Sequence, residues 1–492
     1  MIVKDFRKGF YETIQHQRVL VLVGFDVDGL CACKILQYLF QCDQILYTIV
    51  PVVGKEDLER AFVENSEGIK YVLMINCGAN LDVVETLQPE DHVIFYICDS
   101  HRPVDIHNVY NAVQVKLLMN QEDLDEVPEY DSLFRDDESD DDSGNDSDAS
   151  EQSSKRRRFN EEALDRRREK RVWNENRNKI LFSYTQFSSY GTSAALTMFE
   201  LAWKMSKDTN DLLWLAIIGV TDQYVHYKTP REKYIEDIMA LQSHVSRHNR
   251  RTEDDENIIS INCLKIVFDD ELQLALYRHW SLFESLRHSV NMACKFKVWT
   301  QKGQKRLHEF LAEMGMPLSQ CKQKYTAMDS SLRGNIKTMM QEHMTKYGLV
   351  AQDVVVPSFS AQYGYKNKLS ANDVAYAAVA VLESIEKGKT STDNFLGAVD
   401  VLQSNGHYQM AMEIKAWSEG TPDVKYFSKP QSAEAAQVTL EATVRVSLGK
   451  AFEQAASATT SRILQDSFDF SMVEMKSEDK NKFFDALISL LQ

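Results

Sequence analysis

The chain has 492 residues, of which 43% are hydrophobic, and a net charge of −17. This size and hydrophobic content predict two or three folded domains rather than a disordered protein. The negative charge disfavours broad nonspecific binding to DNA or anionic membranes, although it leaves room for a local basic groove. Scattered cysteines, the lack of a signal peptide and the lack of a membrane-spanning apolar run predict a soluble, intracellular protein.

The N-terminal part alternates between apolar strands and short helices. After a helix at 6–15, strands are predicted at 19–25, 44–53, 71–75 and 92–98, with helices at 31–40, 56–63 and 81–87. Such strand–helix repeats are typical of βαβ units, so we expect an α/β fold with a doubly wound parallel sheet. Polar residues follow several strands, and the carboxyl edge of such a sheet is where ligands bind.

Asp26 and Asp28 follow the first strand directly. Because side chains alternate along a strand, we expect both carboxylates to point the same way from its carboxyl end. Two carboxylates held there suit Mg²⁺ or Mn²⁺. The pair could equally cap the next helix, and the motif alone does not separate these interpretations.

An acidic segment at 136–151 contains nine acidic residues in sixteen and is expected to be a solvated loop. Its serines are phosphorylation candidates, and mass spectrometry of the native protein tests them: Ser139, Ser143 and Ser147. A basic run follows, which is either a nuclear-import signal or a helix face paired with nearby acids: Lys155, Arg156, Arg157 and Arg158.

The second half is predicted to be mainly helical. Helices are expected at 194–205 and 211–220, and residues 231–390 are predicted to form a helical insertion with few strands. Leu307, Phe310, Leu311 and Met314 follow the spacing of one buried helix face. Histidines without metal-ligand spacing are interpreted as ordinary: His244, His248 and His279. In the tail, strands are predicted at 424–427 and 438–446, and helices at 450–464 and from 477.

The motifs of several nucleotide-binding and phosphatase families are absent or incomplete in this sequence. The chain has neither a phosphate loop nor a GxGxxG sequence. The FDVDG motif is similar to that of haloacid-dehalogenase-like phosphatases, but their threonine is replaced here by Leu30.

Four motifs resemble those of the DHH phosphoesterases, the superfamily of the RecJ exonuclease: FDVDG, INCG, DSHRP and TDQ. In active members these motifs hold two Mn²⁺ or Mg²⁺ ions that activate water. The resemblance assigns seven positions, called the relic residues below: Asp26, Asp28, Asn76, Asp99, Ser100, His101 and Asp222. Asn76 replaces an aspartate ligand and Ser100 replaces a histidine ligand, so we expect no catalysis and no bound metal. Asp26, Asp28 and Asp222 are the residual candidates for a single ion.

Longer matches resemble the eukaryotic cell division control protein 45 family, among them DFRKGFYE, MINCGAN, CDSHRPV, TSAALTMFELAW and GQKRLHEFLAEMG. Members are inactive RecJ relatives that join the MCM ring and the GINS complex in the CMG replicative helicase. The resemblance implies a nuclear DNA replication scaffold without a cofactor, which works beside DNA polymerase and other replisome factors. A groove for single-stranded DNA belongs to this expectation.

The resemblance also implies a division into domains. We expect a DHH domain in two parts (1–130 and 173–230), separated by a disordered acidic and basic loop (131–172). The helical insertion (231–390) would contact the helicase partners, and a smaller C-terminal α/β domain (391–492) would follow. That last domain is predicted to be shortened between Trp417 and Gly449.

Two other functions compete with the scaffold. One is a residual metal-dependent phosphoesterase or single-strand exonuclease that uses Asp26, Asp28 and Asp222. The other is an adaptor that binds its partners through the acidic segment alone.

Overall fold

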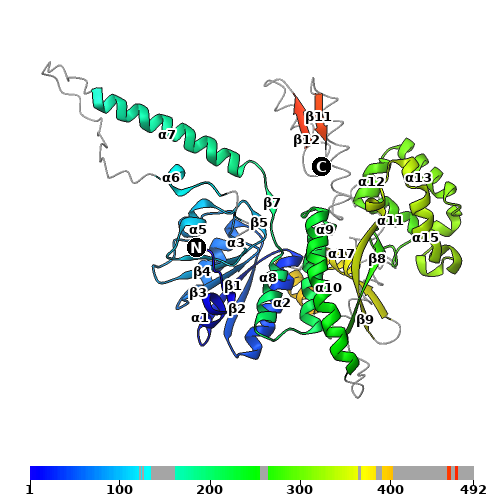
Figure 1. The fold of residues 1–492 in the computed structure, drawn as a ribbon, viewed down its shortest axis with the longest axis horizontal. Helices are drawn as coiled ribbons and strands as arrows, with labels where there is room; N and C mark the ends of the chain where they lie inside the picture. Colours follow the sequence, from blue (N-terminus) through cyan, green and yellow to red (C-terminus); the bar gives the residue numbers. More distant parts are fainter. Residues whose placement is uncertain are drawn as a thin grey trace. The chain divides into compact units, whose positions relative to one another are not determined.

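The computed structural model describes residues 1–120, 124, 127–134, 161–254, 264–363, 367–383, 390–402, 462–466 and 471–474 (Figure 1). Its contacts divide the chain into two compact units. The first unit contains residues 1–22, 45–48 and 56–192, and the second contains 23–44, 49–55 and 193–492. The five-part division derived from the sequence stays a prediction.

A five-stranded sheet in the order β2-β1-β3-β4-β6 confirms the predicted α/β fold. Its strands are β1 (Arg18–Gly24), β2 (Leu46–Val52), β3 (Tyr71–Ile75), β4 (Ile94–Cys98) and β6 (Val115–Leu117). β3 pairs with β4 in parallel, and β4 pairs with β6 in parallel. Every residue of β3 is buried, which explains its unbroken apolar sequence, because a central parallel strand is covered on both faces.

Short helices connect these strands near their predicted positions. They are η1 (Arg7–Tyr11), α1 (Glu12–Ile14), α3 (Lys55–Asn65), α4 (Val83–Leu87), α5 (Ile106–Tyr110) and α6 (Tyr130–Leu133). A two-stranded antiparallel pair joins β5 (His101–Arg102) to β7 (Ser189–Tyr190). Helix α7 covers Glu161–Thr185, so the expected loop over 131–172 is wrong for its last part. The acidic segment 136–151 and the basic run 155–158 lie outside the described residues.

The second unit contains a group of helices around α9 (Asn210–Val225). This helix packs against α2 (Val27–Cys42), α8 (Ala194–Lys204), α10 (Arg231–Asp254) and α17 (Ala371–Leu382). Its residues from Leu212 to Val225 are all buried, in agreement with the apolar run that predicted it. Helix α18 (Ser391–Val401) packs against α17.

Residues 264–370 contain more strand than the sequence indicated. An antiparallel sheet has the order β10-β9-β8, formed by β8 (Leu264–Leu272), β9 (Val355–Tyr363) and β10 (Asn367–Ser370). β8 combines buried apolar residues with exposed charged ones, and this mixed pattern was interpreted as helical. The helices between β8 and β9 are α11 (Leu282–His288), α12 (Val290–Phe296), α13 (Gln301–Glu313), α14 (Leu318–Lys322), η3 (Tyr325–Ala327), α15 (Ser330–His343), η4 (Thr345–Tyr347) and α16 (Ala351–Val354).

These helices share one hydrophobic core. The rings of Phe296, Phe310 and Tyr347 meet at centroid distances of 5.0 to 5.8 Å. The predicted stripe of α13 is confirmed, because Leu307, Phe310, Leu311 and Met314 are all buried in this core.

The described part of the tail is a short antiparallel pair of β11 (Arg462–Asp466) and β12 (Ser471–Glu474). The helix predicted at 450–464 is therefore wrong where β11 begins, and the other tail elements lie outside the described residues. In the part of the chain that the structure describes, no helix has an apolar stretch long enough to cross a membrane.

Candidate functional site

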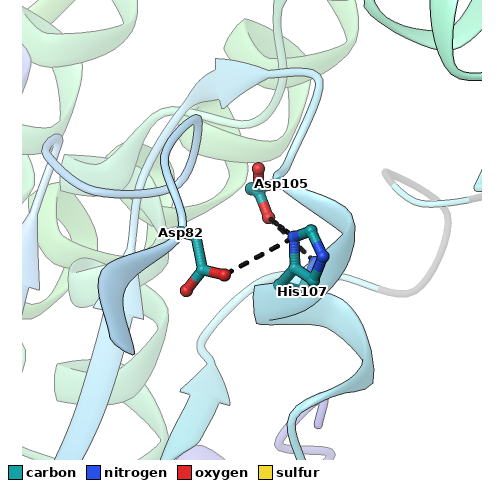
Figure 2. A group of neighbouring side chains, drawn as sticks. All are labelled: Asp82, Asp105 and His107. Atoms are coloured by element: carbon teal, nitrogen blue, oxygen red, sulfur yellow. Dashed lines mark hydrogen bonds and ion pairs between the residues drawn. The ribbon is translucent and has the colours of Figure 1, made fainter. Parts of the chain in front are cut away.

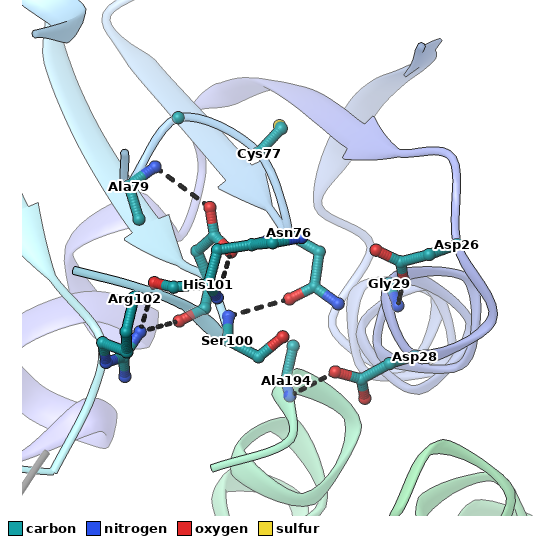
Figure 3. Close-up of polar contacts among 12 residues, drawn as sticks. Asp26, Asp28, Gly29, Asn76, Cys77, Ala79, Ser100, His101, Arg102 and Ala194 are labelled. Atoms are coloured by element: carbon teal, nitrogen blue, oxygen red, sulfur yellow. Dashed lines mark hydrogen bonds and ion pairs between the residues drawn. The ribbon is translucent and has the colours of Figure 1, made fainter. Parts of the chain in front are cut away.

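Asp26 and Asp28 lie on a helix start rather than on a strand end. β1 ends at Gly24, and Asp26 is the N-cap of α2, where its Oδ1 accepts a hydrogen bond from the Gly29 amide at 2.6 Å. Asp28 is already in the first turn of that helix. The two carboxylates therefore have different hydrogen-bond partners, as Figure 3 shows, and the strand alternation from which a common direction was predicted does not apply to them.

The carboxylate of Asp28 caps a second helix. One oxygen accepts hydrogen bonds from the Ser193 hydroxyl and, at 3.0 Å, from the Ala195 amide. The other accepts from the Ala194 amide at 2.9 Å and from the Gln223 side-chain amide at 3.3 Å. The first amides of a helix lack partners within it and carry a partial positive charge. The amides at the N-terminus of α8 thus already bind the carboxylate that a metal ion would need as a ligand.

Asp222 is fully buried in α9, so its motif lies within a helix and not at a strand end. Its Oδ1 lies 2.9 Å from Nδ1 of His226, and its Oδ2 lies 3.3 Å from Nζ of Lys228. Burial alone would raise the pKa of the Asp222 carboxyl, but Lys228 and His226 outweigh it and lower this pKa to about 2. Asp222 is therefore an ionised carboxylate that is paired with a lysine of the same chain.

The three carboxylates are close enough to the thiol of Cys31 to act on it electrostatically. Burial raises the pKa of this thiol well above its usual value, and Asp28, Asp222 and Asp26 raise it further. Cys31 is therefore a neutral, buried thiol rather than a nucleophile. Within the described residues, Asp26, Asp28 and Asp222 do not bring three ligand atoms within 4.8 Å of one another.

Within the first unit, the relic residues form a hydrogen-bonded group. Asn76 has a positive φ of 46°, a left-handed conformation that asparagine adopts more readily than most residues. Its side-chain oxygen accepts a hydrogen bond from the Ser100 amide at 3.0 Å. Both residues are buried, and this contact joins the ends of β3 and β4 (Figure 3).

The carboxylate of Asp99 also accepts hydrogen bonds from backbone amides. One of its oxygens accepts from the Ala79 amide at 3.0 Å, and the other accepts from the His101 amide at 2.9 Å. The same second oxygen lies 2.7 Å from Nδ1 of His101. Arg102 donates to the carbonyl oxygens of Asp99 and His101, each at 2.8 Å. These contacts shape the loop after β4.

The structure thus forms two local groups from the relic residues. Asn76, Asp99, Ser100 and His101 come together in the first unit, and Asp26, Asp28 and Asp222 all act on the thiol of Cys31 in the second. Ser193 and Lys228 were missed by the sequence analysis because they lie outside the recognised motifs. Gln223 belongs to the TDQ motif, but the resemblance assigned it no role. A histidine four residues after Asp222 is the one signal that could have pointed to its partners.

The other candidates have structural partners or lie outside the described residues. His248 lies 2.9 Å from the Asp208 carboxylate, and His279 lies 3.6 Å from that of Asp373. The candidate phosphorylation serines and the nuclear-import run are not in the described part of the chain.

Comparisons with known proteins all point to one family. A model of the CDC45 family matches residues 19–126 and 116–437. The chain is 46% identical to cell division control protein 45 homologs from Mus musculus and Homo sapiens, over the full length of each pair. The homolog from Schizosaccharomyces pombe is 34% identical, over 74% of this chain and 62% of its own. A crystal structure of CDC45 from Entamoeba histolytica matches all of both chains with a TM-score of 0.63 at 22% identity, a likeness of fold.

The alignment with the mouse protein spans 567 positions, whereas this chain has 492 residues. The mouse protein therefore contains residues that this chain lacks. Their location is not given by the alignment length, so the shortening between Trp417 and Gly449 stays a prediction.

Proposed function

We propose that this chain, which belongs to the CDC45 family, is a non-catalytic DNA replication factor of the nucleus. In this proposal it is the scaffold subunit that joins the MCM ring to the GINS complex and completes the CMG replicative helicase. DNA polymerase, other replisome factors and single-stranded DNA are its further partners. The names of its relatives support a role in cell division control, and the relic residues support the absence of catalysis.

One observation carries the non-catalytic part of the proposal: internal groups already hold the carboxylates that a two-metal hydrolase would use. The α8 N-terminus binds Asp28, and Lys228 pairs with Asp222. A two-metal site needs several anionic ligands and open coordination positions around both ions. The ammonium group of Lys228 would repel a divalent cation at Asp222, and the cation would have to displace this group in order to bind.

We expect the purified protein to show no Mn²⁺-dependent degradation of 5′-labelled single-stranded DNA. An active DHH exonuclease is the positive control, and Asp222→Asn is the matched variant, because it removes the charge and keeps the shape. Binding to the same DNA is measured in parallel. Degradation by the wild type that disappears in Asp222→Asn would contradict the proposal and favour the residual phosphoesterase.

We also expect the full chain to co-purify with MCM and GINS subunits when they are expressed together. A variant that lacks residues 136–151 is expected to keep this association, since the folded units would provide the contacts. Loss of all partner binding in this deletion variant would favour the acidic-segment adaptor. Failure of the wild type to associate with either complex would contradict the scaffold role.

A further inference from the structure

We propose that Asp82, Asp105 and His107 bind one divalent transition-metal ion, with Zn²⁺ as the best match. The group lies in the first unit and shares no residue with the relic group, so this inference is independent of the proposed function. All three residues are at helix starts: Asp82 is the N-cap of α4, Asp105 is the N-cap of α5, and His107 is in the first turn of α5.

Two of the three ligand-atom separations are close to those around one tetrahedral ion. Nδ1 of His107 lies 3.1 Å from Oδ1 of Asp105 and 3.5 Å from Oδ2 of Asp82 (Figure 2). The three ligand atoms all lie within 4.8 Å of one another. A tetrahedral Zn²⁺ with ligands at about 2.0–2.2 Å separates them by roughly 3.3–3.6 Å. The two distances to Nδ1 of His107 therefore need shifts of only a few tenths of an ångström, and the two aspartate oxygens, at most 4.8 Å apart, would close onto the same ion.

Hydrogen bonding alone is a poorer account of this arrangement. Two carboxylate oxygens face the same ring nitrogen of His107, which carries at most one hydrogen. The contact to Asp82, at 3.5 Å, is too long for a strong hydrogen bond. Two neighbouring carboxylates also repel each other unless a cation lies between them. A metal ion at this point would bind Oδ2 of Asp82, Nδ1 of His107 and Oδ1 of Asp105, which keeps a second lone pair beside the hydrogen bond it accepts from the His107 amide at 2.8 Å. Two carboxylates with a neutral imidazole would balance the charge of the ion.

The backbone around the site is fixed without the metal. Oδ1 of Asp82 accepts the Glu85 amide at 3.0 Å, which leaves the other oxygen directed at His107. The buried side chain of Asn108 accepts from the Val83 amide at 3.2 Å and donates to the Leu81 carbonyl at 2.6 Å. Asn108 thereby links the start of α4 to α5. Ligands that are positioned by such surrounding contacts bind a metal with little further ordering.

The site is accessible to metal and water. The side chain of His107 is 44% exposed, and those of Asp82 and Asp105 are 20% and 26% exposed. Asp105 and His107 also line a cavity of about 360 Å³, together with Arg177 and Tyr184. Three protein ligands and an accessible fourth position make an open site, in which we expect water as the last ligand.

The test is isothermal titration of the full chain with Zn²⁺ alone. Asp82→Asn and His107→Ala are the site variants. His92→Ala is the matched control, because His92 is also an exposed histidine beside a carboxylate, 3.2 Å from Glu90. We expect one binding event that weakens at least about tenfold in both site variants and is unchanged in His92→Ala.

Co²⁺ gives a second readout, because a tetrahedral site with a histidine ligand produces intense visible absorption bands, whereas the octahedral aqueous ion absorbs only weakly. We expect these bands in the wild type and in His92→Ala, and their loss in Asp82→Asn and His107→Ala. Circular dichroism checks that all variants are folded. Equal Zn²⁺ affinity in the wild type and the site variants, or no binding by the wild type, would overturn the proposal. Neither result bears on the nuclease and co-purification tests.

Discussion

Replacement of Asp28 by alanine is expected to destabilise the second unit by about 3–5 kcal/mol. The substitution leaves the Ser193 hydroxyl, two α8 amides and the Gln223 amide without their common acceptor. Asp28 is only 2% exposed, so water cannot replace it without rearrangement of the helices. Hydrogen exchange of peptides from α2, α8 and α9 measures this loss, because it reports the opening of each helix separately.

Two further substitutions separate the helix-capping role of Asp28 from a general effect of mutation. Asp26→Ala removes one N-cap hydrogen bond and is expected to cost only about 1 kcal/mol. Gly219→Ala would place a methyl group 2.6 Å from Cβ of Ala195 and 2.8 Å from the Asp28 carboxylate, at an expected cost of about 1–3 kcal/mol. Gly334→Ala is its control, since no atom outside the nearby backbone of its own helix lies within 4 Å of the new methyl group.

The opposite result would restore a metal-binding interpretation. If Asp28→Ala were as stable as the wild type, and Mn²⁺ stabilised only the wild type, the carboxylate would be a ligand rather than a cap. The carboxylates of an empty metal site repel one another, so replacing one of them removes this repulsion and stabilises the metal-free protein. Removal of a carboxylate that is surrounded by donors has the reverse effect.

The sequence predicted the parts of the fold that depend on local apolar patterns. β3 was predicted to the residue, because a run of five buried apolar side chains between polar neighbours has few other structures. The buried face of α13 followed from its spacing in the same way. β8 was missed because Asp269, Asp270 and Glu271 interrupt its apolar pattern, and only its pairing with β9 makes the segment a strand.

The candidate site was less predictable because it depends on contacts between distant segments. Asp28 could be identified as functional from its motif, but Ser193 and Gln223, which bind it, are more than 160 residues away. The motif also gave the wrong local geometry, since α2 begins at Val27 and Asp28 is already helical. Asp82 and Asp105 each resemble an ordinary helix cap in the sequence, and only the fold brings them to one histidine.

Replacement of Lys228 by methionine is expected to destabilise the second unit near neutral pH by about 2 kcal/mol. The pKa of Asp222 in the folded protein is about 2, below its usual value of 3.8, and Lys228 is the main cation that lowers it. A lowered carboxyl pKa stabilises the folded state above pH 3.8, and this contribution is lost as the pH falls through about 2. The free energy of unfolding of the variant should therefore differ most from that of the wild type above pH 4 and least near pH 2. Hydrogen exchange of α9 peptides measures the difference near neutral pH, and urea unfolding followed by circular dichroism extends it to acidic pH.

The double variant Lys228→Met/Asp222→Asn decides whether the buried charge causes the loss. Without the carboxylate no uncompensated buried charge remains, so we expect the double variant to recover part of the stability that Lys228→Met loses. Lys346→Met is the control, because it removes an exposed lysine paired with Glu313, and exposed pairs contribute little. A Lys228→Met protein with wild-type stability at pH 7 would show that Asp222 does not need this cation. In that case the argument against catalysis would rest on Asn76, Ser100 and the capping of Asp28 by α8.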